Sequence, residues 1–280
     1  MSYFIDDVMQ KIYFRADASA TIGYGHFIRT LALADMLKDD FDCTFFTCHP
    51  TSYQVSEMEK VCPFIPLQEE THSADFLSHL QGDEIVVLDN YFFTTDYQRA
   101  IKQKGCRLVC VDDMHDKHYV ADVVINHTLT DSGLFDVEPY TKLCLGFDWA
   151  LLRRPFIEAV NKLCSCAKRT ESITITFGGV DSFDFTGHYI REAMQLPTVS
   201  QITAVVGDAY QPQKPRVRDR RVSYCSNLTA QQMAELFCAS DWVICSASTV
   251  SLEAIACGAK LAVGWYVDCL LYTSDAADDK

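Results

Sequence analysis

Residues 14–37 read FRADASATIGYGHFIRTLALADML, and this stretch decides the fold class. It begins as an apolar strand, passes through a loop of small residues and continues as a helix with apolar side chains at helical spacing. Gly23 and Gly25 stand at the junction, where glycine lets a chain turn sharply and approach a ligand closely. The stretch therefore predicts the first strand–loop–helix unit of a parallel α/β sheet.

The same alternation continues through the first half of the chain. Short runs rich in Val and Ile predict strands, and amphipathic stretches between them predict helices. The predicted strands are 11–16, 43–48, 84–91, 107–112 and 122–126, and the predicted helices are 25–38, 52–60, 72–80 and 94–104. Helices that alternate with strands in this way cover both faces of a parallel sheet.

The pattern breaks at 148–168 and then restarts as a second unit of the same kind. Its predicted strands are 172–177, 201–206, 222–226, 242–246 and 260–267, and its predicted helices are 185–195, 230–239 and 250–257. We therefore expect an α/β protein of two Rossmann-like domains, residues 1–150 and 151–267, with a ligand cleft between them.

The last residues do not continue this rhythm. Residues 268–280 read DCLLYTSDAADDK, which resembles translated adapter sequence more than protein. We therefore expect a second domain that is truncated near Asp268 and a tail that is non-native. A genuine frayed acidic terminus is the alternative.

Composition argues against several classes of protein. A net charge of −14 over 280 residues disfavours binding to duplex nucleic acid, which requires a basic face. No apolar run is long enough to span a membrane, and the first ten residues lack a signal-peptide pattern. The 13 cysteines occur without a CxxC pair, as is typical of buried thiols in a reducing compartment. We expect a cytoplasmic monomer that binds a small molecule, with neither nucleic acid nor membrane as partner.

His26 is the first candidate for chemistry. It follows Gly25 at the start of a predicted helix, where free N–H groups and the positive end of the helix dipole disfavour an imidazolium. A neutral imidazole at such a place can take a proton from water. A helix-capping or interface role fits the same spacing. Arg29, one turn on, either reaches a carboxylate or phosphate or lies on the surface.

Acidic side chains follow two of the predicted strands. Asp89 ends one, and Asp112 with Asp113 ends the next. Carboxylates at these positions can orient a base, bind sugar hydroxyls or hold a metal, but adjacent aspartates face opposite ways and make poor joint ligands, so we predict no metal site. Asp89 and Tyr91 point to the same side of a strand and form the better pair for a site.

Two segments of the second half are typical of nucleotide-sugar binding. Gly178 and Gly179 follow a predicted strand and would let a phosphate approach the backbone. Ser248 and Thr249 begin a helix that could hold a pyrophosphate, and Glu253, one turn inside, could accept from a ribose diol. Ordinary turn chemistry and helix capping account for the same residues.

Taken together, these segments resemble the UDP-2,4-diacetamido-2,4,6-trideoxy-β-L-altropyranose hydrolases of pseudaminic acid biosynthesis. That family belongs to the glycosyltransferase-B (GT-B) superfamily and is related to the lipid II-forming GlcNAc transferase. The resemblance covers residues 11 to about 267, and its most specific part is RADASATIGYGHFIR at 15–29. The other matching segments are 88–91 (LDNY), 111–113 (VDD), 121–126 (ADVVIN), 150–153 (ALLR), 177–182 (FGGVDS) and 248–253 (STVSLE).

The resemblance implies a role for each candidate residue. His26 would be the general base that activates water for attack at the anomeric carbon, UDP would leave with inversion of configuration, and no cofactor or metal would be needed. Asp17 and Tyr91 would lie near the sugar, and Arg153 close to the nucleotide. The implied substrate-binding set is Asp17, Gly25, Arg29, Asp89, Tyr91 and Arg153, and the implied nucleotide-binding set is Gly178, Gly179, Ser248, Thr249 and Glu253.

One departure from the family pattern concerns the end of the chain. The family usually has an Asn-Gln pair after the last strand, and here Asp268 is followed by Cys269 and Leu270. The difference supports truncation and puts activity of the chain as given in doubt. Two other functions stay open: a glycosyltransferase in which His26 deprotonates an acceptor hydroxyl, and a non-catalytic protein that binds a nucleotide sugar.

Overall fold

The structure is a computed structural model that describes residues 9–18, 24–160, 171–178, 181–207 and 210–264. The chain divides into two compact units, Met1–Leu151 and Leu152–Lys280, one residue beyond the boundary predicted from the sequence. Unit 1 and unit 2 are each built around a parallel sheet. Gly179 and the tail at 268–280 lie outside the described residues.

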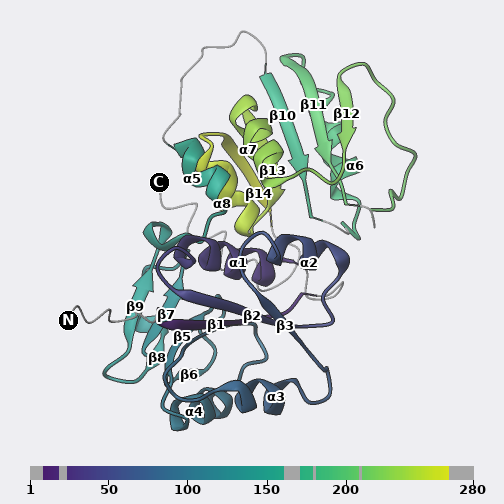
Figure 1. Ribbon diagram of the computed structural model, residues 1–280. Coiled ribbons are helices and arrows are strands. Elements are labelled where there is room, and N and C mark those ends of the chain that lie inside the picture. The colour runs from purple at the N-terminus through teal and green to yellow at the C-terminus, as the bar shows by residue number, and fades with distance from the viewer. Residues whose placement is uncertain (1–8, 19–23, 161–170, 179–180, 208–209, 265–280) are drawn as a thin grey trace, which may run out of the picture. The chain divides into compact units, whose positions relative to one another are not determined.

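Unit 1 contains a sheet of seven parallel strands in the order β3-β2-β1-β4-β5-β7-β9 (Figure 1). The strands are β1 (Lys11–Ala16), β2 (Asp42–Cys48), β3 (Phe64–Leu67), β4 (Ile85–Asp89), β5 (Arg107–Val111), β7 (Val123–Asn126) and β9 (Lys142–Leu145). The sequence analysis did not predict β3 and β9. Both have four residues and lie at the edges of the sheet, where a strand needs little apolar patterning and tolerates Pro66.

Helices cover both faces of this sheet. Figure 1 shows α1 (Gly25–Leu37) and α2 (Ser52–Met58) on one face, and α3 (His72–His79) and α4 (Thr95–Gln103) on the other. Phe27 of α1 packs with Phe14 and Phe45 in one core, and Phe76 of α3 packs with Phe46 in the second core. The alternation of side chains along β2 therefore feeds both cores, as a two-sided sheet requires.

Shorter elements complete unit 1. Strands β6 (His118–Tyr119) and β8 (Asp136–Val137) pair with each other, apart from the large sheet. Two single 3₁₀ turns, η1 (Ser132–Leu134) and η2 (Phe147–Trp149), flank β9 in the sequence.

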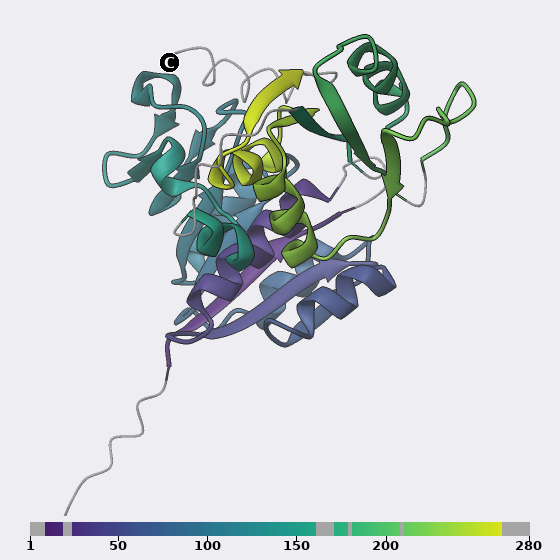
Figure 2. The ribbon, with the colours of Figure 1, turned by 90° about the horizontal axis from the view of Figure 1, so that it is seen from above.

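Unit 2 contains a sheet of five parallel strands in the order β12-β11-β10-β13-β14. Its elements are α5 (Arg154–Val160), β10 (Glu171–Thr176), α6 (Phe185–Ala193), β11 (Val199–Val205), β12 (Val222–Cys225), α7 (Ala230–Ala239), β13 (Trp242–Ser246), α8 (Thr249–Ala256) and β14 (Lys260–Gly264). Helices α5, α7 and α8 share one core, and α6 packs into a separate core on the opposite face (Figure 2). Helix α5 forms within the stretch that the sequence analysis treated as a break.

The strand orders show where each sheet can bind a ligand. In unit 1 the chain moves outward from β1 to β2 and β3 and then restarts on the other side of β1 with β4; unit 2 does the same between β10 and β13. Ligands of such sheets bind at the carboxyl ends of the strands beside this reversal. In unit 1 those ends lead to His26 and Asp89, and in unit 2 they lead to Gly178 and Ser248.

Across the part of the chain that the structure describes, every helix is too short or too polar to cross a bilayer.

Candidate active site

His26 and Asp89 form a direct contact at the carboxyl edge of the unit 1 sheet. His26 is the second residue of α1, and its Nδ1 lies 2.6 Å from Oδ1 of Asp89, the last residue of β4. Both side chains are buried. A carboxylate can only accept, so the Nδ1–H of His26 donates to Asp89, which leaves Nε2 with the free lone pair of a base.

Arg29 fixes Asp89 in this position. Its Nε donates to Asp89 Oδ2 and its Nη2 to Asp89 Oδ1, both at 2.6 Å, and Thr30 Oγ1 adds a bond of 2.7 Å to Oδ2. Burial would raise the pKa of Asp89, but Arg29 and His26 hold that pKa well below its usual range. The surface alternative for Arg29 is wrong, because the residue is 4 % exposed and bound to carboxylates. Arg29 and Asp89 therefore support His26 from within the protein.

Asp113 is a second carboxylate bound to Arg29. It was not among the predicted site residues. Arg29 Nη1 donates to Asp113 Oδ2 at 2.6 Å, and the hydroxyl of Tyr91 donates to the same oxygen at 3.4 Å. The rings of Tyr91 and His26 pack edge to face, with their centroids 4.4 Å apart. The neighbouring Asp112 instead accepts from backbone N–H groups of the turn that follows. The position of Asp113 after β5, at the same edge as Asp89, was the signal that could have identified it.

Asp17 joins the ends of three strands at this edge. It forms a buried ion pair with Arg15, its Oδ1 accepts from the N–H of Cys48 at 2.7 Å, and its own N–H donates to Asn90 Oδ1 at 2.7 Å. β1, β2 and β4 are held together in this way. Contact between Asp17 and a sugar stays a prediction.

Gly25 leaves the start of α1 open. Within the part of the chain that the structure describes, a Cβ placed on Gly25 would meet no atom within 4 Å, and the N-cap residue Tyr24 supplies no side-chain hydrogen bond. Packing therefore does not require a glycine here, and the absence of a side chain keeps the first N–H groups of the helix accessible.

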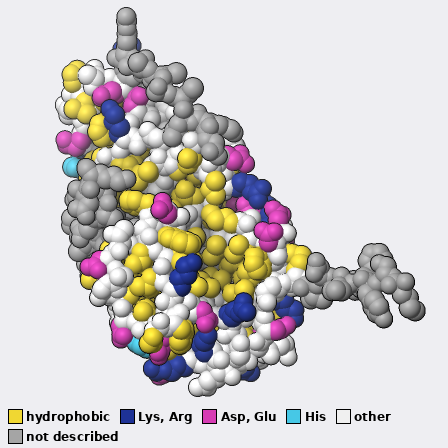
Figure 3. All heavy atoms as spheres, turned by 90° about the vertical axis from the view of Figure 1, so that its left-hand side faces the viewer, with side chains coloured by type: hydrophobic (Ala, Val, Ile, Leu, Met, Phe, Trp, Pro, Cys, Tyr) yellow, Lys and Arg dark blue, Asp and Glu magenta, His cyan; other side chains and the backbone are white. Residues whose placement is uncertain are grey.

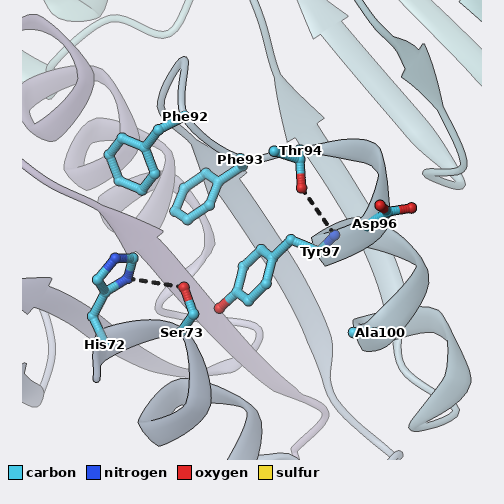
Figure 4. A pocket seen from close by; sticks show the side chains of 8 residues that line it. All are labelled: His72, Ser73, Phe92, Phe93, Thr94, Asp96, Tyr97 and Ala100. Atoms are coloured by element: carbon cyan, nitrogen blue, oxygen red, sulfur yellow. Dashed lines mark hydrogen bonds between the residues drawn. The ribbon is translucent and has the colours of Figure 1, made fainter. Parts of the chain in front are cut away.

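A pocket of about 600 Å³ lies beside this edge of unit 1 (Figure 4). Its lining residues come from the start of α3, the loop after β4 and the start of α4: His72, Ser73, Phe92, Phe93, Thr94, Asp96, Tyr97 and Ala100. Phe92 directly follows Tyr91, so the pocket begins one residue from the ring that packs on His26. The sequence analysis did not predict this pocket.

Polar groups of defined character face this pocket. Arg15 Nη2 lies 3.3 Å from His72 Nδ1, and burial together with Arg15 lowers the pKa of His72. Arginine only donates, so Nδ1 accepts and the neutral ring carries its proton on Nε2. The hydroxyl of Tyr97 is inaccessible to solvent and has no hydrogen-bond partner among the described residues, and Figure 4 shows it pointing toward Ser73. The pocket thus combines aromatic walls with the hydrogen-bonding groups of His72 and Tyr97 and with the carboxylate of Asp96, which pairs with Arg99.

The two helix starts of unit 2 differ in charge. Asp181 accepts from the N–H groups of Phe185 and Thr186 at 3.0 and 2.8 Å, and Asp184 accepts from Gly187, so buried carboxylates occupy the start of α6. The start of α8 carries no side-chain cap: Ser248 is its N-cap residue, and its hydroxyl lies 3.1 Å from that of Ser246.

These differences favour one anion site over the other. A phosphate would be repelled at α6 and attracted at α8, where Thr249 is the first helical residue. Gly178, after β10, has a φ of 79°, in the left-handed region that favours glycine, and a Cβ there would meet no protein atom within 4 Å.

Arg153 and Glu253 are brought together within unit 2. Nε and Nη2 of Arg153 donate to Oε1 and Oε2 of Glu253 at 2.7 and 2.9 Å. Glu253 is 1 % exposed, and the pair ties the start of α5 to α8. Each carboxylate oxygen keeps a second lone pair that a further donor can use. Among the residues that the structure describes, no three His, Cys, Asp or Glu side chains are grouped as metal ligands.

Comparison with known protein sequences gives two distant relatives. No family model matches the chain. It is 24 % identical over 269 residues to the uncharacterized protein MJ1062 of Methanocaldococcus jannaschii, covering 90 % of this chain and 55 % of that protein, so this chain spans about half of the relative's length. It is also 24 % identical over 268 residues to the UDP-2,4-diacetamido-2,4,6-trideoxy-β-L-altropyranose hydrolase of Campylobacter jejuni, covering 92 % of each chain.

Comparison with solved structures defines the fold. MurG of Acinetobacter baumannii superposes with a TM-score of 0.62 at 12 % identity, over 96 % of this chain and 84 % of that chain. Arabidopsis thaliana UGT89C1 in complex with UDP gives 0.65 at 10 % identity, over 95 % and 83 %. Anabaena HepE in complex with UDP-glucose gives 0.56 at 15 % identity, over 90 % and 80 %. The chain therefore has the fold of two Rossmann-like domains found in GT-B glycosyltransferases, as the sequence predicted.

Proposed function

We propose that this protein is a UDP-sugar hydrolase of pseudaminic acid biosynthesis, located in the cytoplasm. Its substrate would be a UDP-linked 2,4-diacetamido-2,4,6-trideoxyhexose, as the name of the Campylobacter relative suggests. The observation that carries the proposal is the buried contact of 2.6 Å between His26 and Asp89, which leaves Nε2 of His26 as a base at the ligand-binding edge of the sheet.

Hydrolysis would proceed in one displacement at the anomeric carbon. Nε2 of His26 takes a proton from water as the water oxygen bonds to that carbon, and the bond to the UDP oxygen breaks with its electron pair leaving on UDP. The configuration at the carbon inverts. Asp89 keeps its bond to Nδ1–H and stabilises the imidazolium that forms. A general base of this kind contributes typically ~10²–10⁴-fold, so positioning and stabilisation of the leaving group must supply the rest.

UDP is assigned to residues of unit 2. The uncapped start of α8, with Ser248 and Thr249, would receive the diphosphate, and Gly178 would allow close approach of the backbone, as would Gly179, which lies outside the described residues. The second lone pairs of Glu253 would accept from the ribose diol, with Arg153 holding that carboxylate in place.

The sugar is assigned to residues of unit 1. Asp17, Gly25 and Tyr91 would lie along it, and Arg29 and Asp89 would act through His26. The aromatic pocket at His72 suits an N-acyl group, because His72 offers a hydrogen-bond donor to its carbonyl and the aromatic side chains can pack against its methyl group.

A glycosyltransferase is the second candidate, and one observation favours it. Four large hydrophobic side chains near the edge strand β9 are exposed: Leu134, Tyr140, Phe147 and Trp149. Figure 3 shows that hydrophobic side chains gather on the face of the molecule that it displays. An apolar surface on unit 1 could receive a lipid-linked acceptor, whose hydroxyl would replace water beside His26.

Proton NMR of the UDP-sugar with the protein tests both candidates. A hydrolase converts the anomeric signal to that of the free sugar, inverted, without any acceptor. His26→Asn should lower turnover ~10²–10⁴-fold and leave UDP affinity, measured by calorimetry, nearly unchanged. His79→Asn is the matched control, because His79 is exposed and ends α3, at the opposite end of that helix from His72. Turnover that survives in His26→Asn would exclude the general-base role, and release of UDP only with an acceptor would favour the transferase.

A further inference from the structure

Asp113 is buried in the site without a place in the mechanism above. It follows β5, its side chain is 7 % exposed, and its Oδ2 binds both Arg29 and Tyr91. Its Oδ1 is closed to solvent and accepts no hydrogen bond from any residue that the structure describes, with His127 Nε2 at 3.9 Å. Burying a carboxylate is costly, and structures retain such groups where they compensate another charge.

The charge that Asp113 compensates belongs to Arg29. Nη2 of Arg29 lies 3.1 Å from Nδ1 of His26, so a fixed cation stands against the ring that must take up a proton. Burial would lower the pKa of Arg29, but Asp113 and Asp89 raise it well above its usual value, so Arg29 keeps its charge. With Asp89 alone, the guanidinium and the carboxylate would cancel, and an imidazolium would meet no net negative charge.

Counting the groups around His26 shows what Asp113 adds. Burial would raise the pKa of Asp113, but Arg29 lowers it, and Asp89 behaves in the same way, so both carboxylates are ionised. Burial lowers the pKa of His127 to about 4, so that ring is neutral near pH 7. Tyr91 is a neutral phenol beside them. The array formed by His26, Arg29, Asp89 and Asp113 therefore carries one net negative charge while His26 is neutral. It carries no net charge once His26 is protonated.

We propose that Asp113 is a positioning residue for the reaction of His26. It offsets Arg29, so that Asp89 can stabilise the imidazolium, and it holds Tyr91 against the imidazole ring. The proposal rests on the proposed function only in taking His26 as the base. Its structural content, that protonation of His26 depends on a carboxylate bound to Arg29, stands independently of the substrate.

An NMR titration of the His26 ring tests the proposal without turnover. The His26 signal is assigned as the one missing from His26→Asn. In Asp113→Asn the titration midpoint should fall by about one pH unit, because the protonated ring loses a compensating charge. Asp112→Asn is the matched control: its carboxylate caps the following turn and faces Lys117, outside the array, so the midpoint should stay within a few tenths of a unit. An unchanged midpoint in Asp113→Asn would overturn the proposal.

Two further measurements keep the test decisive. Asp113→Glu retains the charge and should retain the midpoint. In the unsubstituted protein, the ¹³C signal of the Asp113 carboxyl should shift as His26 titrates, and in His26→Asn this shift should vanish. If Asp113→Asn does not fold, this carboxyl signal decides the question, and a signal that ignores His26 contradicts the proposal.

The pH–rate profile separates this inference from the proposed function. If the protein hydrolyses the UDP-sugar, the acid limb should move to lower pH in Asp113→Asn, and the plateau rate should fall by a factor of about three because a weaker base reacts more slowly. A profile that does not move contradicts the positioning role alone. Absence of hydrolysis by the unsubstituted protein, with the NMR coupling intact, contradicts the hydrolase proposal alone.

Discussion

Each unit contains a buried carboxylate held by an arginine through two hydrogen bonds, yet the two pairs are connected differently. In unit 2, Arg153 and Glu253 bind each other and link α5 to α8. In unit 1, Asp89 is shared between Arg29 and His26, and Arg29 is shared between Asp89 and Asp113. The first is a closed pair, and the second is a chain of charges that ends on a titratable ring.

This difference shows that an arginine–carboxylate contact does not by itself identify a functional site. What distinguishes unit 1 is that its carboxylate also binds an imidazole ring, that of His26. The predictions below test the contrast by removing one member at a time.

The largest effect is expected from Asp89→Asn. An uncharged amide leaves Arg29 buried with one carboxylate instead of two, and breaking a buried pair costs about 3–5 kcal/mol of unfolding free energy. The orientation of His26 is lost as well, so turnover should fall as far as in His26→Asn. Urea unfolding and UDP release measure the two effects. A variant within about 1 kcal/mol of the parent would show that the chain of charges does not stabilise unit 1.

A pH-dependent effect is expected from His127. The pKa of His127 is about 4 in the folded protein and near 6.5 in the unfolded chain. As the pH falls from 6.5 to 4, the unfolded chain therefore binds a proton at His127, whereas the ring stays unprotonated in the folded protein. Stability should therefore drop by about 3 kcal/mol in this window, and His127→Gln should remove that drop. Asp89 and Asp113 have lowered pKa values and lose their stabilisation only at lower pH.

His118→Gln is the control for His127. Asp136 and Glu138 raise the pKa of His118, so its small contribution is present below about pH 6.5 and is lost as pH rises, the opposite sign. Urea unfolding at pH 7 and at pH 4.5 distinguishes the two residues. Equal slopes in His127→Gln and the parent would contradict the buried, neutral state of His127.

The smallest effect is expected from Glu253→Gln in unit 2. Arg153 is partly exposed and can turn to water, so the loss of unfolding free energy should be about 1–2 kcal/mol. If the ribose uses this carboxylate, UDP affinity should fall about tenfold, a difference of ~1.4 kcal/mol. Glu235→Gln, on the exposed side of α7, is the control for calorimetry. Unchanged UDP affinity in Glu253→Gln would leave the pair with a structural role only.

Most of the fold could be predicted from the sequence because its signals are local. Apolar runs and helical periodicity gave β1, α1, α7 and β13 with at most one residue of difference in their bounds. Strands β3 and β9 were missed, because four residues at a sheet edge carry too little pattern. Helix α5 was missed because its apolar residues follow a proline and two arginines.

The candidate site was predictable only in part. His26 stood out because it follows Gly25 at the start of a predicted helix, and Asp89 and Tyr91 stood out because they share one side of the predicted strand 84–91. The structure brings the three together, although β4 ends at Asp89 and Tyr91 follows the strand. The other contacts depend on side-chain directions at loops and helix starts, which the sequence does not show. Arg29 binds two carboxylates, and Asp113 points toward Arg29 whereas Asp112 points away. In unit 2, Glu253 binds Arg153.

The sequence by itself determined two units of alternating strand and helix, and it determined which residues stand at strand ends, because periodicity and burial are properties of short segments. Only the tertiary structure decided which charges meet. Residues 26, 89 and 113 come from three different strand–helix units, and their contacts exist because parallel strands bring their carboxyl ends to one edge of a sheet. In that buried setting an arginine must be neutralised, and two aspartates distant in the sequence therefore became partners of Arg29.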